Sequence, residues 1–290
     1  MAAIARRFRA ARLHYGHGTA CARDEAAWLV AHVLGRDPRR FAAYAQTVVP
    51  PALVQRARRL AARRVRERTP LAYLLGEAWL DGRRFHVDRR AIVPRSFIAE
   101  ALRTGFQPWH RRPVYKALDL GTGSGCLAVL LALHFPRARV DAVDLSRAAL
   151  CVAAKNVARH GVARRVRLVQ SDLFQALGRR RYDLIVANPP YVERRMLARL
   201  PAEYRREPRL ALDGGAKGLR VLRRILQQAR MHLRPHGLLV CETGDARAAL
   251  ERAFPLLPFI WLPTSEPESC VFALPREALP GRRPQRGPRT

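Results

Sequence analysis

The fold is decided by the stretch Ala117-Leu118-Asp119-Leu120-Gly121-Thr122-Gly123-Ser124-Gly125. Its first four residues predict a short buried strand, and the residues that follow it predict an apolar helix. Glycines between a strand and a helix let the backbone turn sharply and pass close to a ligand. A dinucleotide fingerprint would have glycine or alanine where Cys126 stands, so the match to a nicotinamide site is imperfect. The stretch therefore predicts a strand, a ligand-binding loop and a helix in succession.

Strands and helices alternate along the chain from residue 115 onward. The predicted strands are residues 117–120, 140–145, 166–170, 184–187, 238–242, 259–262 and 270–274. The predicted helices are residues 126–135, 147–160, 219–233 and 247–254. Alternation of this kind indicates a parallel sheet that is covered by helices on both faces. We therefore predict an α/β fold for this part of the chain.

Acidic residues stand at the ends of the second and third predicted strands. Asp144 follows the glycines by about 20 residues, the position at which an acid accepts both hydroxyls of a ribose. Ser171-Asp172-Leu173-Phe174 places an acid beside apolar side chains, which suits the edge and the face of an adenine. Either aspartate could instead cap the helix that follows it. Because ligands in open α/β sheets bind at the carboxyl ends of strands, we expect these ends to form one crevice.

The fourth predicted strand ends in the tetrapeptide Asn188-Pro189-Pro190-Tyr191. Proline cannot continue a sheet ladder, so the strand stops here, and the rigid prolines hold the Asn188 side chain and nearby carbonyls as a fixed set of acceptors. Two acceptors can bind the hydrogens of a planar –NH2 group and return electron density to its delocalised nitrogen. The ring of Tyr191 can stack on such a flat group. The alternative is a turn that the asparagine merely caps.

The residues before the α/β part predict a helical region followed by a hairpin. Residues 25–34 are amphipathic, residues 35–38 break the pattern, and residues 53–65 resume it with arginines on the outer face. The period of the apolar residues then changes, and residues 79–87 predict a hairpin that turns at Asp81-Gly82.

The composition of the chain is strongly basic. The chain has 290 residues, 49% of them hydrophobic, and a net charge of +31. Such a charge predicts attraction to RNA or to a ribosomal surface, because polybasic surfaces bind phosphates without sequence specificity. The alternative is a genome-wide bias toward arginine codons, since the only lysines are Lys116, Lys155 and Lys217. No apolar run approaches the ~18 residues that cross a bilayer.

The cysteines and the first residues of the chain indicate where in the cell the protein is located. The five cysteines are scattered and form no CxxC pair, which indicates reduced thiols in the cytosol and argues against a zinc site. The first acidic residue, Asp24, is preceded by Arg6, Arg7, Arg9 and Arg12, as in an organellar transit peptide. The segment lacks the serine enrichment of such peptides, so we favour an exposed basic helix face and a cytoplasmic protein.

Taken together, these motifs resemble those of class I S-adenosylmethionine-dependent methyltransferases, in the subgroup that methylates planar –NH2 groups. Within it, the chain is similar to the protein-(glutamine-N(5)) methyltransferases over nearly all of residues 7–279. Some segments resemble the branch that acts on large-subunit ribosomal protein L-three, rather than the branch that modifies peptide-chain release factors. These segments are Tyr15-Gly16-His17-Gly18-Thr19, Gly76-Glu77-Ala78-Trp79, Val93-Pro94-Arg95-Ser96 and Pro201-Ala202-Glu203-Tyr204-Arg205-Arg206-Glu207-Pro208.

The resemblance implies a fold, a cofactor and a set of site residues. The fold is a Rossmann-like seven-stranded sheet with a small helical N-terminal domain, and the cofactor is S-adenosylmethionine, without a metal. The implied catalytic residues are Asn188, Pro189, Pro190 and Tyr191. The implied cofactor-binding residues are Asp119, Gly121, Thr122, Gly123, Ser124, Gly125, Asp144, Asp172, Leu173 and Asn188. Arg95 and Glu207 are candidates for binding the substrate backbone, although an ion pair would explain either residue equally well.

The resemblance also implies a domain organisation and a substrate. The division is a helical substrate-recognition domain at residues 1–75, a β-hairpin linker at 76–114, the methyltransferase domain at 115–279 and a disordered basic tail at 280–290. The substrate is a glutamine side-chain amide of a large-subunit ribosomal protein. The expected partners are that protein and, through the basic surface, RNA or the ribosome, without a membrane.

Other functions compete with this interpretation. One is methylation of release factors by the sister branch. Another is methylation of adenine N6 or cytosine N4, which binds an amine in the same way and flips a base into the site. The basic charge favours that alternative, and the lack of a separate target-recognition region opposes it. A non-catalytic RNA or ribosome binder would not need Asn188, Asp144 and the glycine run together.

Overall fold

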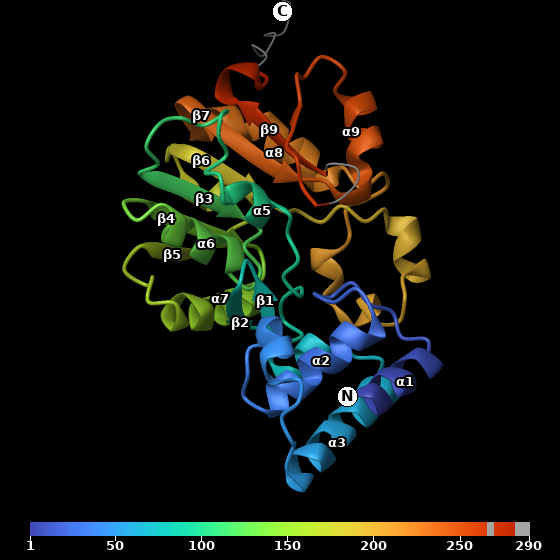
Figure 1. Ribbon diagram of the computed structural model, residues 1–290. Coiled ribbons are helices and arrows are strands. Elements are labelled where there is room, and N and C mark those ends of the chain that lie inside the picture. Colours follow the sequence, from blue (N-terminus) through green and yellow to red (C-terminus); the bar gives the residue numbers. More distant parts are fainter. Residues whose placement is uncertain (266–269, 282–290) are drawn as a thin grey trace, which may run out of the picture.

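The α/β part of the protein is built on a seven-stranded sheet, shown in the computed structural model of Figure 1. The structure describes residues 1–265 and 270–281, so most of the predicted basic tail lies outside the described residues. The strands of the sheet are β3 (Lys116–Leu120), β4 (Arg139–Asp144), β5 (Val166–Gln170), β6 (Tyr182–Ala187), β7 (Leu233–Glu242), β8 (Ile260–Trp261) and β9 (Val271–Pro275). Each falls where the sequence predicts a strand, and the predicted fold class is confirmed.

The strand order is β5-β4-β3-β6-β7-β9-β8. All neighbours from β5 to β7 are parallel, as predicted, whereas β9 is antiparallel to both β7 and β8. The prediction of a parallel sheet is therefore wrong at β9. The reason is the short connection: only residues 262–270 separate β8 from β9, too few for the helical crossover that a parallel pair requires.

Helices cover both faces of the sheet. One face packs against α5 (Ile98–Leu102), α6 (Cys126–His134) and α7 (Arg147–Arg159), and the other against α8 (Arg220–His232) and α9 (Arg247–Ala253). Along β6, Leu184 and Val186 join the first core, and Ile185 and Ala187 join the second. Because both faces of the central strand β6 are buried, its residues Leu184 to Ala187 are all apolar, and the first polar residue, Asn188, follows at its end.

The first 75 residues form a separate helical layer, drawn in blue in Figure 1. Its helices are α1 (Ala2–Ala10), α2 (Ala22–Val33), α3 (Pro51–Glu67) and α4 (Leu71–Leu75), with a 3-10 helix at Pro38–Tyr44. The arginines of α1 are exposed, as predicted. On α3 most arginines are exposed too, but Arg64 is 0% exposed, so the predicted outward arginine face is wrong there. Arg64 turns inward because the buried carboxylate of Glu25 binds it.

The predicted hairpin connects the helical layer to the sheet. It consists of β1 (Glu77–Leu80) and β2 (Arg83–His86), with Leu80 paired to Arg83. Asp81 and Gly82, with φ of 46° and 72°, make the left-handed turn that the Asp-Gly pair predicts. Farther along, Ile98 and Leu102 of α5 are buried in the core of the sheet. The second half of segment 76–114 thus contributes to the α/β core, and the domain division itself stays a prediction.

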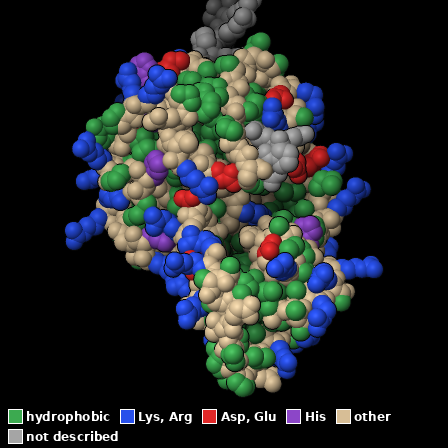
Figure 2. All heavy atoms as spheres, in the orientation of Figure 1, with side chains coloured by type: hydrophobic (Ala, Val, Ile, Leu, Met, Phe, Trp, Pro, Cys, Tyr) green, Lys and Arg blue, Asp and Glu red, His purple; other side chains and the backbone are tan. Residues whose placement is uncertain are grey.

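Basic side chains are spread over the molecule. Figure 2 shows Lys and Arg scattered around the visible face, with no single patch that collects them. Within the part of the chain that the structure describes, no helix has both the length and the apolarity needed to cross a membrane.

Candidate active site

A cavity of about 1840 Å³ lies at the carboxyl ends of β3 to β7. The loops after these strands form one wall, through residues 121–124, 143–146, 171–173, 188–192, 242 and 244–245. The opposite wall comes from the N-terminal part of the chain, through residues 14, 16, 18–20 and 90–97. The predicted crevice therefore exists, and the helical layer and its connection close it from the other side.

The glycine loop gives the cavity its open floor. Gly121, Gly123 and Gly125 have φ of 73°, 55° and 79°, a left-handed conformation that side chains disfavour. A Cβ on Gly121 would meet no described atom within 4 Å, so this position leaves space for a ligand. A Cβ on Gly125 would lie 2.9 Å from Cβ of Ala153, so this glycine lets α7 pack closely. The loop thus leaves space for a ligand at Gly121 and packs closely against α7 at Gly125.

Asp119 lies behind the cavity wall and not in it. Its Oδ2 accepts hydrogen bonds from Thr122 Oγ1 at 2.6 Å and Ala128 N at 3.0 Å, which fix the glycine loop to the start of α6. Its Oδ1 is buried without a partner among the described residues. Burial raises the pKa of Asp119 to about 7. The structure therefore gives this predicted cofactor-binding residue a supporting position.

Asp144 lines the cavity, and its carboxylate can accept further hydrogen bonds. Its Oδ2 accepts from Gly123 N at 2.8 Å, and its Oδ1 accepts from Ser146 N at 2.8 Å. Ser146, whose Oγ accepts from Ala149 N, is the residue that caps α7. Asp144 is therefore not the helix cap, and its carboxylate, which has about four acceptor positions, keeps acceptor capacity for a ligand. Burial raises the pKa of Asp144, and backbone N–H groups oppose that rise.

Asp172 and Leu173 also line the cavity, but Asp172 has a partner that sequence reasoning missed. Arg224 of α8 donates two parallel bonds of 2.9 Å to the two oxygens of Asp172. A bidentate pair of this kind fixes the plane of the carboxylate. Leu173 has a φ of 52°, which turns the loop at this point. Nothing in the sequence singles out Arg224 from the many other arginines.

Asn188 lines the cavity wall that the strand ends form. Its strand, β6, lies between β3 and β7, and Asn188 lines the cavity together with Pro189, Pro190 and Tyr191. The side-chain amide of Asn188 makes no hydrogen bond with any described residue. The alternative that this asparagine caps its own turn is therefore not what the structure has, and its amide oxygen is available to a ligand.

Tyr191 is fixed by glycines that the sequence reasoning did not single out. A Cβ on Gly244 would lie 2.3 Å from Cε2 of the Tyr191 ring, and one on Gly218 would lie 2.3 Å from the Tyr191 carbonyl oxygen. A Cβ on Gly214 would lie 2.8 Å from the Tyr191 carbonyl carbon. Burial raises the pKa of Tyr191, so its hydroxyl stays protonated. The glycine cluster before α8 is the signal that could have identified this support.

Arg95 and Glu207 form an ion pair with each other. Arg95 Nη1 and Nη2 donate to the two Glu207 oxygens at 2.7 Å each, and Val93 N adds a bond of 2.9 Å. Burial alone would raise the pKa of Glu207, but Arg95 and His17 together outweigh it and the pKa falls to about 2. Of the two alternatives left by the sequence, the structure has the ion pair.

Glu242 is an acid at the end of β7 that the sequence reasoning missed. It lines the cavity, and its Oε2 accepts from Ser96 Oγ at 2.6 Å and from Phe97 N at 2.9 Å. Burial raises the pKa of Glu242 to about 7. Its place at the end of the next strand was the available signal.

Known proteins share both parts of the chain. Residues 8–76 match the family model described as PrmC N-terminal domain, and residues 104–200 match the one described as Methyltransferase small domain. The ribosomal protein uL3 glutamine methyltransferase of Bordetella pertussis is 52% identical over 275 residues, which cover 94% of this chain and 92% of that protein. The protein of the same name from Bradyrhizobium diazoefficiens is 48% identical over 274 residues, with 92% and 86% covered. A solved methyltransferase from Pyrococcus furiosus has a TM-score of 0.49 and 20% identity, with 77% of this chain and 98% of that chain covered.

The sheet, the helices on its faces and the matched family model define a class I methyltransferase. Because relatives at 52% and 48% identity cover 94% and 92% of the chain, it belongs to the family of ribosomal protein uL3 glutamine methyltransferases. The resemblance inferred from the motifs is confirmed at the level of the family and of the enzyme class.

Proposed function

We propose that the protein transfers a methyl group from S-adenosylmethionine to the side-chain amide nitrogen of a glutamine in large-subunit ribosomal protein uL3. The observation that carries the chemistry is the Asn188 amide, which lines the cavity and makes no hydrogen bond with any described residue. A buried-strand end that keeps such an amide unbonded suits the recognition of another amide. The names of the relatives support the choice of substrate.

The residues of the cavity fit S-adenosylmethionine. A Cβ at Gly121 would enter open space, so the loop leaves room for a ligand beside the backbone. Asp144 lines the cavity with a carboxylate that keeps acceptor capacity, which suits ribose hydroxyls. Leu173 and the carboxylate of Asp172 suit the face and edge of an adenine. When bound, the cofactor supplies an electrophilic methyl group.

The protein's own contribution is to orient the glutamine amide. Asn188 Oδ1 and the Pro189 carbonyl would accept the two amide hydrogens, and Tyr191 would pack against the amide plane. As the nitrogen gains positive charge, the same oxygens stabilise it, so preorganised dipoles lower the barrier. The amide proton becomes acidic once the new bond forms, so no strong general base is required. Alignment of the two reactants supplies much of the rate gain.

Replacing Asp144 with alanine is expected to weaken the binding of S-adenosylmethionine by about 5- to 150-fold, or about 1–3 kcal/mol, because ribose hydroxyls lose their acceptor. Isothermal calorimetry measures this directly. Asp141→Asn is the matched control, because Asp141 lies on the same strand, pairs with Arg167 and does not line the cavity. Equal affinity in the wild type and Asp144→Ala would remove Asp144 from the ribose site.

The substrate is tested by incubating the enzyme and labelled cofactor with purified uL3 and, separately, with a purified release factor. Mass spectrometry of the digested proteins then locates the label. We expect one methyl group on a glutamine of uL3 and none on the release factor. Charge attraction raises the rate of encounter, but the fit of the pocket decides which glutamine reaches Asn188. Label on the release factor alone would overturn the choice of branch.

We further propose a cytoplasmic location, from the scattered cysteines and the expected substrate. Contact with RNA or the ribosome through the basic surface is a weaker proposal. On the face drawn in Figure 2 the arginines are spread out, which is what a codon bias toward arginine would produce.

A further inference from the structure

The segment after the Asn-Pro-Pro-Tyr motif leaves the sheet and returns to it before α8. We call residues 193–213 the strap. Its two ends meet beside Tyr191: Val192 N donates to Leu212 O at 3.0 Å, and Gly214 N donates to Val192 O at 2.8 Å. The strap therefore starts and finishes at the motif, and any movement of the strap is anchored there.

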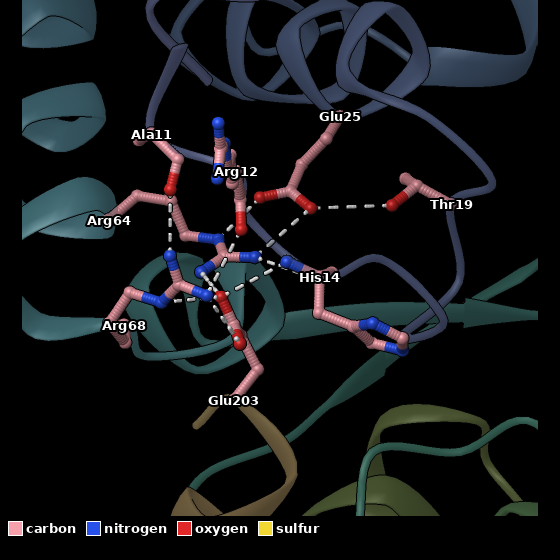
Figure 3. A network of polar contacts seen from close by, with 8 residues as sticks. All are labelled: Ala11, Arg12, His14, Thr19, Glu25, Arg64, Arg68 and Glu203. Carbon is pink, nitrogen blue, oxygen red and sulfur yellow. Dashed lines mark hydrogen bonds and ion pairs between the residues drawn. The ribbon is translucent and has the colours of Figure 1, made fainter. Parts of the chain in front are cut away.

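The middle of the strap is inserted into the helical layer (Figure 3). Glu203 is 0% exposed, and it accepts from Arg64 Nη1 at 3.3 Å and from Arg68 Nη2 at 3.2 Å. Arg68 Nε lies 2.9 Å from the same carboxylate. His14 N adds a hydrogen bond of 3.2 Å. A carboxylate of the α/β half is thus held by α3 and by the loop after α1.

The buried cluster holds two arginines and two glutamates, and its charges are equal in number only when the strap places Glu203 among them. Arg64 binds Glu25 of α2 on one side and Glu203 on the other, and Arg68 adds the second positive charge. Burial alone would raise the pKa of Glu203, but the backbone N–H groups and the two arginines outweigh it and lower the pKa. If the strap moved away, Arg64 would keep one partner and lose the other.

A buried ion pair is weak grounds for extra stability, because desolvation offsets most of the attraction. It does favour one arrangement over others, since a displaced carboxylate would be buried without its partners. The network therefore acts mainly to fix where the strap lies relative to the helical layer.

The strap is also a wall of the cavity. Its residues Leu200, Pro201, Tyr204, Pro208 and Leu210 line it. Tyr204 stands next to Glu203 in the chain, and its ring lies 4.4 Å from the ring of His17 and 5.2 Å from the Arg95 guanidinium. The docked carboxylate thus fixes the ring that faces the cavity.

We propose that Glu203 is a positioning residue: through Arg64 and Arg68 it holds the strap on the helical layer and so sets the cavity wall against which a polypeptide segment lies when its glutamine reaches Asn188. This inference rests on the proposed function. It assigns the strap to the binding of the protein substrate and leaves the cofactor to the glycine loop and Asp144.

The test compares Glu203→Gln with Glu67→Gln, a control on α3 whose carboxylate pairs with the exposed Arg63 and Arg66. For Glu203→Gln we expect KM for uL3 to rise about tenfold while kcat changes by less than about threefold, because binding of the ground state and transition state is lost together. Cofactor affinity should stay within about twofold, since Glu203 shares none of its hydrogen-bond partners with Asp144. Glu67→Gln should leave all of these unchanged.

Arg68→Met is a milder variant, because Arg68 is partly exposed and Arg64 remains bound to Glu25. It should raise KM in the same direction, and the double variant with Glu203→Gln should raise KM by less than the product of the two single effects, since the two residues form one pair. A purely structural role would instead lower kcat and cofactor affinity together with stability.

Hydrogen exchange provides a readout that does not depend on the substrate. The amides of Arg206 and Glu207 donate to the Glu203 and Tyr204 carbonyls, and in Glu203→Gln they should exchange about tenfold faster while β6 keeps its protection. Wild-type enzyme that fails to methylate uL3 would refute the proposed function. Unchanged exchange in the strap, or an unchanged KM in an active Glu203→Gln enzyme, would refute the positioning role.

Discussion

Replacing Asn188 with alanine is expected to reduce the turnover of glutamine methylation by about 10²–10³, as the loss of one aligned transition-state dipole does. The folded protein should tolerate the change, because the Asn188 amide makes no hydrogen bond with any described residue and faces the cavity. We therefore expect a free energy of unfolding within about 0.5 kcal/mol of the wild type, as for substitutions away from packing and polar networks. Cofactor affinity should fall little. Single-turnover kinetics with saturating cofactor measures the chemical step.

Gln170→Ala is the matched control for this variant. Gln170 is also an amide at a strand end, on β5, but it is exposed and does not line the cavity; among the described residues its side chain donates one hydrogen bond, to Leu145 O at 3.4 Å. Its removal should leave turnover unchanged. If Asn188→Ala kept turnover within a few-fold of the wild type, recognition of the substrate amide would belong to other groups of the cavity.

Replacing Arg95 with methionine is expected to lower the free energy of unfolding by about 3–5 kcal/mol, because it removes the guanidinium that binds both oxygens of the buried Glu207 carboxylate and leaves His17 Nε2, at 3.6 Å, as the remaining ion-pair partner among the described residues. The Glu207 side chain is 0% exposed and receives both Arg95 bonds at 2.7 Å. Urea denaturation at neutral pH gives the value. Arg103→Met is the control, because it removes an arginine from the exposed pair with Asp81 and should cost less than about 1 kcal/mol.

The same pair predicts how stability depends on pH. Arg95 holds the pKa of Glu207 at about 2 in the folded protein, below the ordinary value of 4.5. The unfolded chain therefore takes up the proton first, so the contribution of the pair is complete above pH 4.5 and is lost as the pH falls toward 2. Arg95→Met should lack this acid-dependent loss. A wild type and a variant with parallel stability curves between these pH values would contradict the assignment.

The sequence predicts most of this architecture because local signals agree with one another. The strand and helix patterns are local, and so are the glycine loop and the proline-terminated strand, which is why their positions are confirmed. Ion pairs between residues that are far apart in the chain give no local signal in the sequence. Arg224 reaches Asp172, and Arg64 is drawn inward by Glu25 and Glu203, although each looks like any other helix arginine. Their burial depends on carboxylates that only the tertiary fold brings near.

In the candidate site, too, the sequence predicts the positions of some residues and not of others. The cavity-lining positions of Asp144 and Asn188 follow from their places at strand ends, which the alternation of strands and helices fixes. The position of Asp119 behind the wall does not, because a strand end alone does not tell whether a side chain points into a cavity or into the core. The glycines around Tyr191 are equally hard to foresee, since their role arises from a backbone approach of one loop to another.

The reversed strand β9 has a consequence for biosynthesis. Because β9 fills the place between β7 and β8, the sheet is incomplete while the chain is still being synthesised up to that strand. Until then the edge of β7 carries unpaired backbone groups next to the apolar side chains of its faces, a surface on which nascent chains associate with each other. Glu242, at the end of β7, gains its neighbour Val271 only with that last pairing. The sheet therefore closes on this side only with its last strand in chain order, and until then β7 is an open edge.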